Sequence, residues 1–164
     1  MELLEVNEKI EGFEQIDFDK AGVKKAMRAI GMLVRRDSRK KVAVSAIKRT
    51  RRKKVYTGSK PGEYPRKLSG TLRKSITARV SRPGFMVKIQ PDPKYYGKDN
   101  FYPAFLWYGV TGKARRQDHK AQVKDGKWRI APRANYMADA LRENESAIRA
   151  ILRDALQNSL KIYP

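Results

Sequence analysis

GEYPRKLSGTLRKSI, at residues 62–76, carries two local signals side by side. Its opening glycine and proline favour turns and extended backbone. Ser69 then stands as a candidate N-cap, and Leu72 and Ile76 are spaced four apart, as on one face of a helix. We therefore predict that an extended segment ends here and that a short helix anchors it to the core.

Upstream of this stretch, the spacing of apolar residues indicates a helix. Asp19 is a candidate N-cap, and apolar residues recur at steps of three and four from Val23 onwards, so we predict one long helix over about 19–47. No period is visible over residues 48–67, and long loops of this kind are usually functional. We predict an extended basic loop there.

Downstream, the chain alternates between apolar and polar residues. The stretch ITARVSRPGFMVKIQP, residues 76–91, has two alternating runs separated by Pro83-Gly84, which predicts a β-hairpin with one buried face. The apolar rows are Ile76, Ala78, Val80 and Phe85, Val87, Ile89. A second hairpin is predicted around Asp125-Gly126, with Val123 opposite Trp128 and Ala121 opposite Ile130.

Two further helices complete the pattern. Aromatic residues in FYPAFLWYG predict a helix over 101–109, which Gly109 ends in a left-handed conformation. A leucine-rich stripe predicts a C-terminal helix over 134–160, interrupted at Asn144-Glu145-Ser146.

These elements together predict an α+β fold. Two long helices would pack on a small antiparallel β-sheet, with a long extended basic loop at 48–67. The 164 residues divide into an acidic N-terminal arm, residues 1–18, and a single domain, residues 19–164.

Charge is distributed unevenly along the chain. The net charge is +21, whereas residues 1–19 hold seven acidic residues against Lys9, a net of −6, so the remaining 145 residues carry +27. A charge of this size favours a polyanion or an acidic protein surface as partner.

The absence of cysteine excludes disulfides and cysteine metal sites. No apolar run is long enough to span a membrane, and the acidic N-terminus does not fit a signal peptide, so we expect folding in a cytosol.

No pattern in the sequence indicates catalysis. His119, beside Asp118, is predicted to be a solvated loop histidine. Asp92 and Asp99 could pair on Mg²⁺, but turn chemistry explains both better. We predict a protein that is not an enzyme and that needs no cofactor or metal.

The clusters of basic and aromatic residues leave alternatives open. The cations could contact DNA phosphates or acidic residues of a neighbouring subunit; they are Arg49, Arg51, Arg52, Lys53, Lys54, Arg115 and Arg116. The aromatic residues of 95–108 could stack on bases, but helical spacing favours a core or subunit-interface role.

The order of parts resembles the tail-component family of tailed bacteriophages typified by HK97 gene product 10, also called neck or tail-completion proteins. The resemblance covers roughly residues 20–160, and Ala131-Pro132 stands where the family's last helix begins. The matching positions are Gly62, Tyr64, Pro65, Ser69, Gly70, Leu72, Ser75, Ile76, Tyr102, Tyr108, Gly109 and Thr111.

This resemblance implies a non-enzymatic virion protein. Six or twelve copies would form a ring at the head–tail junction, against the connector and tail proteins and near the passing DNA, after assembly in the host cytoplasm. The residues expected at subunit interfaces are Tyr56, Tyr64, Pro65, Leu68, Leu72, Ile76, Tyr102, Trp107 and Tyr108. The alternative is a small basic nucleic-acid-binding protein that uses loops 49–54 and 113–116 on phosphates.

Overall fold

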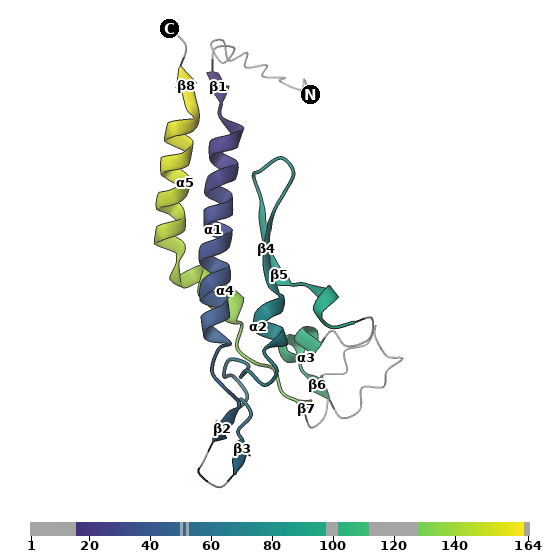
Figure 1. Cartoon of the computed structure of the whole chain (residues 1–164). Helices are drawn as coiled ribbons and strands as arrows, with labels where there is room; N and C mark the ends of the chain where they lie inside the picture. The colour runs from purple at the N-terminus through teal and green to yellow at the C-terminus, as the bar shows by residue number, and fades with distance from the viewer. Residues whose placement is uncertain (1–15, 50, 52, 98–101, 112–127, 163–164) are drawn as a thin grey trace, which may run out of the picture.

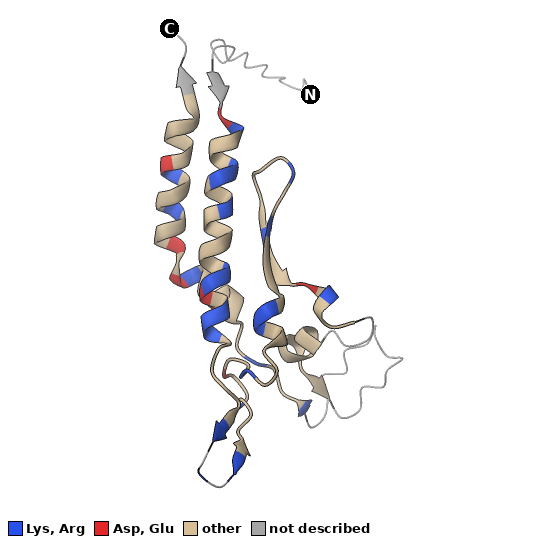
Figure 2. Cartoon of the chain, in the orientation of Figure 1, with Lys and Arg blue, Asp and Glu red and all other residues tan. Residues whose placement is uncertain are grey.

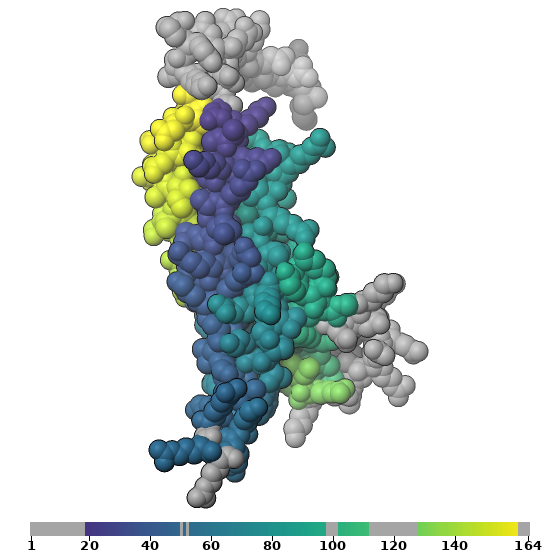
Figure 3. Space-filling model, viewed as in Figure 1, coloured from purple at the N-terminus to yellow at the C-terminus, as the bar shows by residue number. Residues whose placement is uncertain are grey.

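The computed structural model describes residues 16–49, 51, 53–97, 102–111 and 128–162. These residues form an elongated body, with α1 and α5 side by side and a hairpin projecting from one end (Figures 1 and 3). The helices are α1 (Lys20–Lys41), α2 (Thr71–Ser75), the 3-10 helix η2 (Pro93–Tyr95), α3 (Tyr102–Tyr108), α4 (Tyr136–Glu143) and α5 (Glu145–Ser159).

The strands pair only in twos among the described residues. Each of the four ladders is antiparallel: β1 with β8, β2 with β3, β4 with β5, and β6 with β7. The strands are β1 (Ile16–Phe18), β2 (Ile47–Arg49), β3 (Lys54–Tyr56), β4 (Ile76–Val80), β5 (Val87–Pro91), β6 (Val110–Thr111), β7 (Trp128–Ile130) and β8 (Leu160–Ile162).

The helix α1 begins as its sequence predicts. The Asp19 carboxylate accepts a hydrogen bond from the Ala21 backbone N–H at 2.9 Å, which confirms the N-cap. One row of small and apolar residues is buried along α1, comprising Val23, Ala26, Ile30, Gly31, Val34 and Ser38.

The predicted extension of this helix to residue 47 is wrong, since α1 ends at Lys41. Val42 and Ala46 are buried, as their spacing predicts, but they lie in a non-helical turn. There the backbone bonds to the 62–76 segment: Lys67 N–H donates to Val44 C=O at 2.7 Å and Ala46 N–H donates to Lys67 C=O at 2.8 Å. These tertiary bonds replace the helical ones.

The hairpin β4–β5 packs on one side of α1 (Figure 1). The predicted hairpin is confirmed, with Ala78 opposite Ile89 and Val80 opposite Val87. Phe85, which was expected in a buried apolar row, is 51% exposed because it lies outside the strands, in the connection formed by residues 81–86.

Two arginines of α1 bond to the backbone where α2 meets β4. Arg35 Nε donates to Ile76 C=O at 3.1 Å, and Arg39 Nη2 donates to Lys74 C=O at 2.9 Å. These carbonyls lie at the C-terminal end of α2, where cations are favourable. Part of the basic face of α1 therefore holds the fold together.

The other side of α1 is covered by α4 and α5. The single helix predicted over 134–160 is divided at Asn144, at the interruption that its sequence shows. The Asn144 side-chain amide donates to Asp37 of α1 at 3.0 Å and to Ala140 C=O at 2.8 Å. After α5 the chain extends, and β8 pairs with β1, which holds the last residues of the predicted N-terminal arm.

Loop 48–67 is not extended throughout, contrary to the prediction, because part of it forms a β-hairpin. Its first part, with Ile47, forms the β2–β3 hairpin, in which Ile47 lies opposite Tyr56 and Arg49 opposite Lys54.

The predicted aromatic helix is confirmed as α3, followed by Gly109 at φ 73°. The Asp125-Gly126 turn and its first strand lie outside the described residues, while β7 pairs with β6.

The fold is α+β, with finer details that differ from expectation. Only α1 of the two long helices packs on the β4–β5 hairpin, and α5 packs on α1 instead. The predicted single sheet is not formed in the described part of the chain. Each strand there pairs with one other strand, which gives separate two-stranded ladders.

Gly31 provides the first test, because it is where α1 approaches the hairpin most closely. A Cβ at this position would lie 2.8 Å from Val87 Cγ2 and 3.1 Å from Ala78 Cβ. We expect Gly31→Leu to lower the free energy of unfolding by about 1–3 kcal/mol in urea titrations, because it separates the two elements. Ala29→Leu, at an exposed position of α1, should change it little. Equal effects of both substitutions would contradict this packing.

Candidate functional site

The 62–76 segment is fixed by backbone hydrogen bonds at its N-terminal end. Gly62, at φ 76°, donates from its N–H to Pro132 C=O at 3.3 Å, and Ala134 N–H donates to Glu63 C=O at 3.2 Å. Pro65 is buried between these contacts and α2. The stretch between the basic hairpin and the core is therefore a structural device rather than a free linker.

The hydroxyl of Tyr64 joins three elements. It accepts a hydrogen bond from Lys41 Nζ at 3.4 Å and donates to Asp139 Oδ2 at 3.1 Å. Lys41 lies over the Tyr64 ring, 5.0 Å from its centroid, and pairs with Glu143. The hydrogen bond to Glu143 raises the pKa of Lys41, which stays charged. Tyr64 thus links the end of α1 to α4.

The short helix α2 anchors the segment in the core, as predicted. Leu72 and Ile76 are buried in one cluster with Val42 and Tyr136. The N-cap is Gly70, at φ 84°, rather than Ser69. Ser69 Oγ accepts from the Thr71 N–H at 3.2 Å, but Ser69 stands one residue before the N-cap. A left-handed residue precedes the helix, and glycine adopts that conformation without strain.

An apolar groove of about 240 Å³ lies between α3 and the start of α4. We call it the aromatic groove; its lining includes Pro65, Leu106, Trp107, Tyr108, Arg133 and Met137. Trp107 and Tyr108 are 46% and 59% exposed at its edge. Exposed aromatic side chains around an apolar hollow are typical of protein interfaces.

A second groove, of about 300 Å³, lies on the other side of Pro65 and Arg133. We call it the Leu68 groove. Leu68, 60% exposed, and Tyr56 of β3, 65% exposed, both line it. The 62–76 segment therefore separates two hollows that carry exposed apolar side chains.

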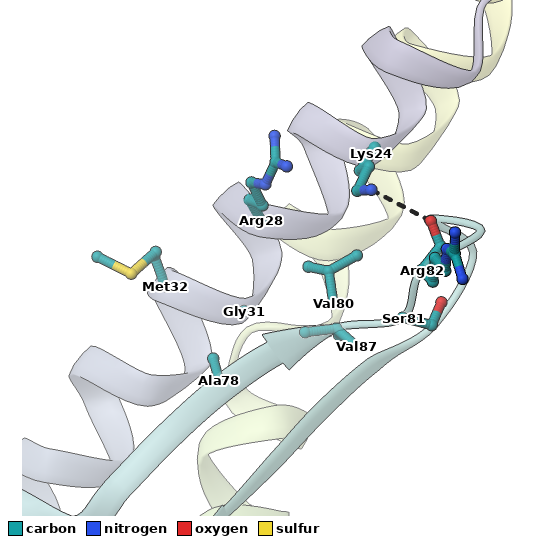
Figure 4. Close-up of a pocket in the computed structure, with 9 residues that line it drawn as sticks. All are labelled: Lys24, Arg28, Gly31, Met32, Ala78, Val80, Ser81, Arg82 and Val87. Atoms are coloured by element: carbon teal, nitrogen blue, oxygen red, sulfur yellow. Dashed lines mark hydrogen bonds between the residues drawn. The ribbon is translucent and has the colours of Figure 1, made fainter.

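Positive charge collects on the β2–β3 hairpin and along α1 (Figure 2). Arg49, Arg51, Lys53 and Lys54 are exposed on or near the projecting hairpin. A third groove, of about 430 Å³, lies between α1 and the β4–β5 hairpin, with Lys24 and Arg28 at its edge (Figure 4). Lys24 Nζ donates to Arg82 C=O at 3.1 Å and so bridges its two walls.

The predicted site residues separate into two groups. Pro65, Leu72 and Ile76 are buried and Tyr64 and Tyr102 are half-buried, so their first role is in the fold. The exposed ones, which remain candidates for assembly, are Tyr56, Leu68, Trp107 and Tyr108. Among the basic candidates, Arg52, Arg115 and Arg116 lie outside the described residues.

The carboxylate considered for metal binding has a structural role. Asp92 caps η2 by accepting from Lys94 N–H at 3.1 Å, and pairs with Arg79 at 2.8 Å. This confirms turn chemistry for Asp92; Asp99, Asp118 and His119 lie outside the described residues. In the described part of the chain, no group of three or more acidic, histidine or cysteine side chains could hold a metal ion. No helix in the same residues is long and apolar enough to cross a membrane.

Arg133 is a residue that sequence reasoning missed. Its Nε and Nη1 are buried, and neither has a hydrogen-bond acceptor. The stretch RIAPRANY gives no sign of this, because an arginine in a polar loop ordinarily faces solvent. Only the tertiary structure places the guanidinium between the aromatic groove and the Leu68 groove.

Comparisons with family models, curated proteins and solved structures gave no match to this chain. The class that its fold defines is α+β, and its resemblance to the phage neck family stays a prediction.

Tyr64→Phe tests whether the hydroxyl contacts matter for the fold. The change leaves Lys41 and Asp139 without this partner, so we expect unfolding to become easier by about 1 kcal/mol. Chemical denaturation with tryptophan fluorescence would measure it. Tyr95→Phe removes a hydroxyl from a side chain that is 43% exposed and should have no comparable effect. If both variants unfold alike, Tyr64 has no joining role.

Proposed function

We propose that this protein is a structural virion protein of a tailed-phage neck. Six or twelve copies form a closed ring that joins the head connector to the tail or completes the upper end of the tail. The observation that carries the proposal is the pairing of a rigid 62–76 segment with exposed apolar side chains on both of its sides.

The exposed apolar residues support association with other chains. Leu68, Tyr56, Trp107 and Tyr108 each leave about half or more of their surface in water. Burying such side chains against another protein is favourable by roughly 25 cal/mol per Å² of apolar area. Leu68 lies in the fixed 62–76 segment, Tyr56 in β3, and Trp107 and Tyr108 in α3, so their backbone loses little flexibility when they dock.

The distribution of these side chains suits a ring. A ring needs two different, complementary surfaces on each subunit, so that head-to-tail contacts close by rotation. The aromatic groove and the Leu68 groove give each subunit two different surfaces: Trp107 and Tyr108 line only the first, and Leu68 and Tyr56 only the second. The projecting β2–β3 hairpin supplies a basic element that reaches beyond the body, toward DNA or an acidic neighbour.

Leu68→Glu tests the ring directly. We expect the wild-type chain to run at the mass of six or twelve copies in light scattering, with ring-shaped particles in electron micrographs. Leu68→Glu places a charge in the interface and should leave monomers, because an unpaired buried carboxylate is strongly unfavourable.

Met86→Glu is a matched control for this test, since Leu68 and Met86 are both 60% exposed. It lies in the connection of the β4–β5 hairpin, away from both grooves, and should leave the rings intact. A wild-type chain that is a compact monomer and is absent from purified virions would contradict the proposal.

A second candidate function is nucleic-acid binding through the basic hairpin. Arg49, Arg51 and Lys54 are exposed and lie on a projecting two-stranded element, which is the observation that favours it. Such a hairpin could follow a phosphate backbone without reading sequence.

The salt dependence of DNA binding tests this candidate. Each phosphate contact contributes about −0.9 to the slope of log K against log salt. The triple variant Arg49→Ala, Arg51→Ala, Lys54→Ala should reduce the slope by about 3 if all three bind phosphates. The control, Lys20→Ala, Arg28→Ala, Arg153→Ala, removes equal charge elsewhere and should keep the slope. Equal slopes in both variants would exclude the hairpin as the contact.

A further inference from the structure

The Arg133 side chain is half-buried, and two nitrogens of its guanidinium lack a hydrogen-bond acceptor. Nε and Nη1 are covered by the protein, and neither has an acceptor among the described residues. The backbone around the side chain is fixed, since Arg133 N–H donates to Leu106 C=O at 2.8 Å. Covered N–H groups without an acceptor are unfavourable, so a carboxylate that bonds to this guanidinium would bind strongly.

The nearest candidate within the chain does not serve. The hydrogen bond from Lys60 N–H, at 2.9 Å, and the charges of Arg66 and Arg133 lower the pKa of the Glu63 carboxyl, which pairs with Arg66 at 3.5 Å. Glu63 is therefore near Arg133, but it leaves Arg133 Nε and Nη1 without an acceptor. The groove beside Arg133 is otherwise apolar, with Leu106, Trp107 and Met137 in its wall. A fitting occupant therefore combines a carboxylate with neighbouring apolar side chains.

Seven of the nine acidic residues in the described part of the chain are already engaged; the other two are Asp17 in β1 and Asp154 in α5. Those in ion pairs with basic side chains of the same chain are Asp37, Glu63, Asp92, Asp139, Glu143 and Glu145. Asp19 caps α1. Residues 1–15, by contrast, hold five glutamates interleaved with apolar side chains, as in the sequence MELLEVNEKIEGFEQ.

We infer that the aromatic groove binds the acidic N-terminal segment, residues 1–15, of a second copy of this chain. A glutamate of that segment bonds to Arg133, and its apolar neighbours lie against Trp107 and Met137. The inference rests on the proposed ring, since it names one contact between neighbouring copies of it.

Geometry favours a neighbouring copy over the same chain. Residue 16 is in β1, which precedes α1, whereas the groove lies by the core cluster around Val42 at the opposite end of that helix. The 22 residues of α1 span about 33 Å. To run back over that length, the chain's own segment would use about ten residues in fully extended form, at about 3.3 Å each. Only its first few residues could then reach the groove, whereas a neighbouring copy can present the whole segment.

Disulfide trapping in the full-length protein tests the contact. The chain has no cysteine, so single substitutions define the linkage. One preparation carries Asn7→Cys, which keeps all five glutamates, and a second, size-tagged preparation carries Ala104→Cys in the wall of the groove. We expect a mixed disulfide between the two after mixing and oxidation, because these cysteines are on different chains.

One control and two variants test whether the mixed disulfide depends on the groove, on Arg133 and on the glutamates. Ala147→Cys, exposed on α5, replaces Ala104→Cys in the control and should give little product. Arg133→Met, or Glu→Gln at residues 2, 5, 8, 11 and 14, should reduce the yield of mixed disulfide about tenfold, as expected when one charge-assisted hydrogen bond is lost. An unchanged yield with Arg133→Met would overturn the inference.

A stability measurement separates binding from a merely structural role. In the background with the five Glu→Gln changes, Arg133→Met should leave the thermal unfolding midpoint unchanged or higher, because it removes covered N–H groups that lack an acceptor. A clearly lower midpoint would show that Arg133 supports the fold and would overturn the inference. Rings that form without any mixed disulfide would overturn it while leaving the proposed function intact. Mixed disulfides without rings would support the contact and contradict the ring.

Discussion

The helix α1 is covered on two sides, and the rest of the structure depends on both coverings. The β4–β5 hairpin packs at Gly31, where the absence of a side chain lets Val87 and Ala78 approach, and α4 and α5 cover the other side. Each covering is thin, so neither forms a large core of its own. The molecule is consequently long and narrow (Figure 3). Many of its large apolar side chains are exposed to solvent.

The C-terminal end of α1 is where the fold and the candidate function meet. Val42, Leu72, Ile76 and Tyr136 form a small core there, and the 62–76 segment passes over it. Because this segment is held from both sides, the side chains that it leaves exposed have fixed positions. Surfaces of that kind suit association between chains better than a mobile basic tail would.

Local signals predicted the elements whose stabilising contacts are near in sequence. Asp19 caps its own helix, Gly109 ends α3, and Asn144 breaks the C-terminal helix where its polar neighbours indicate. The end of α1 was predicted wrongly, because Val44 and Ala46 bond to Lys67, some twenty residues away. The β2–β3 ladder within loop 48–67 gives no visible sequence pattern, because strands of three residues are too short for a recognisable alternation.

The sequence by itself determined the α+β class, the excess of positive charge over the body, the β4–β5 hairpin and the anchoring role of Leu72 and Ile76. These follow from periodicity and composition, which are properties of neighbouring residues. The tertiary structure alone decided which cations hold the fold and which face outward. Arg35 and Arg39 donate to backbone carbonyls, and Nε and Nη1 of Arg133 are covered without an acceptor among the described residues. These roles depend on residues far apart in the chain.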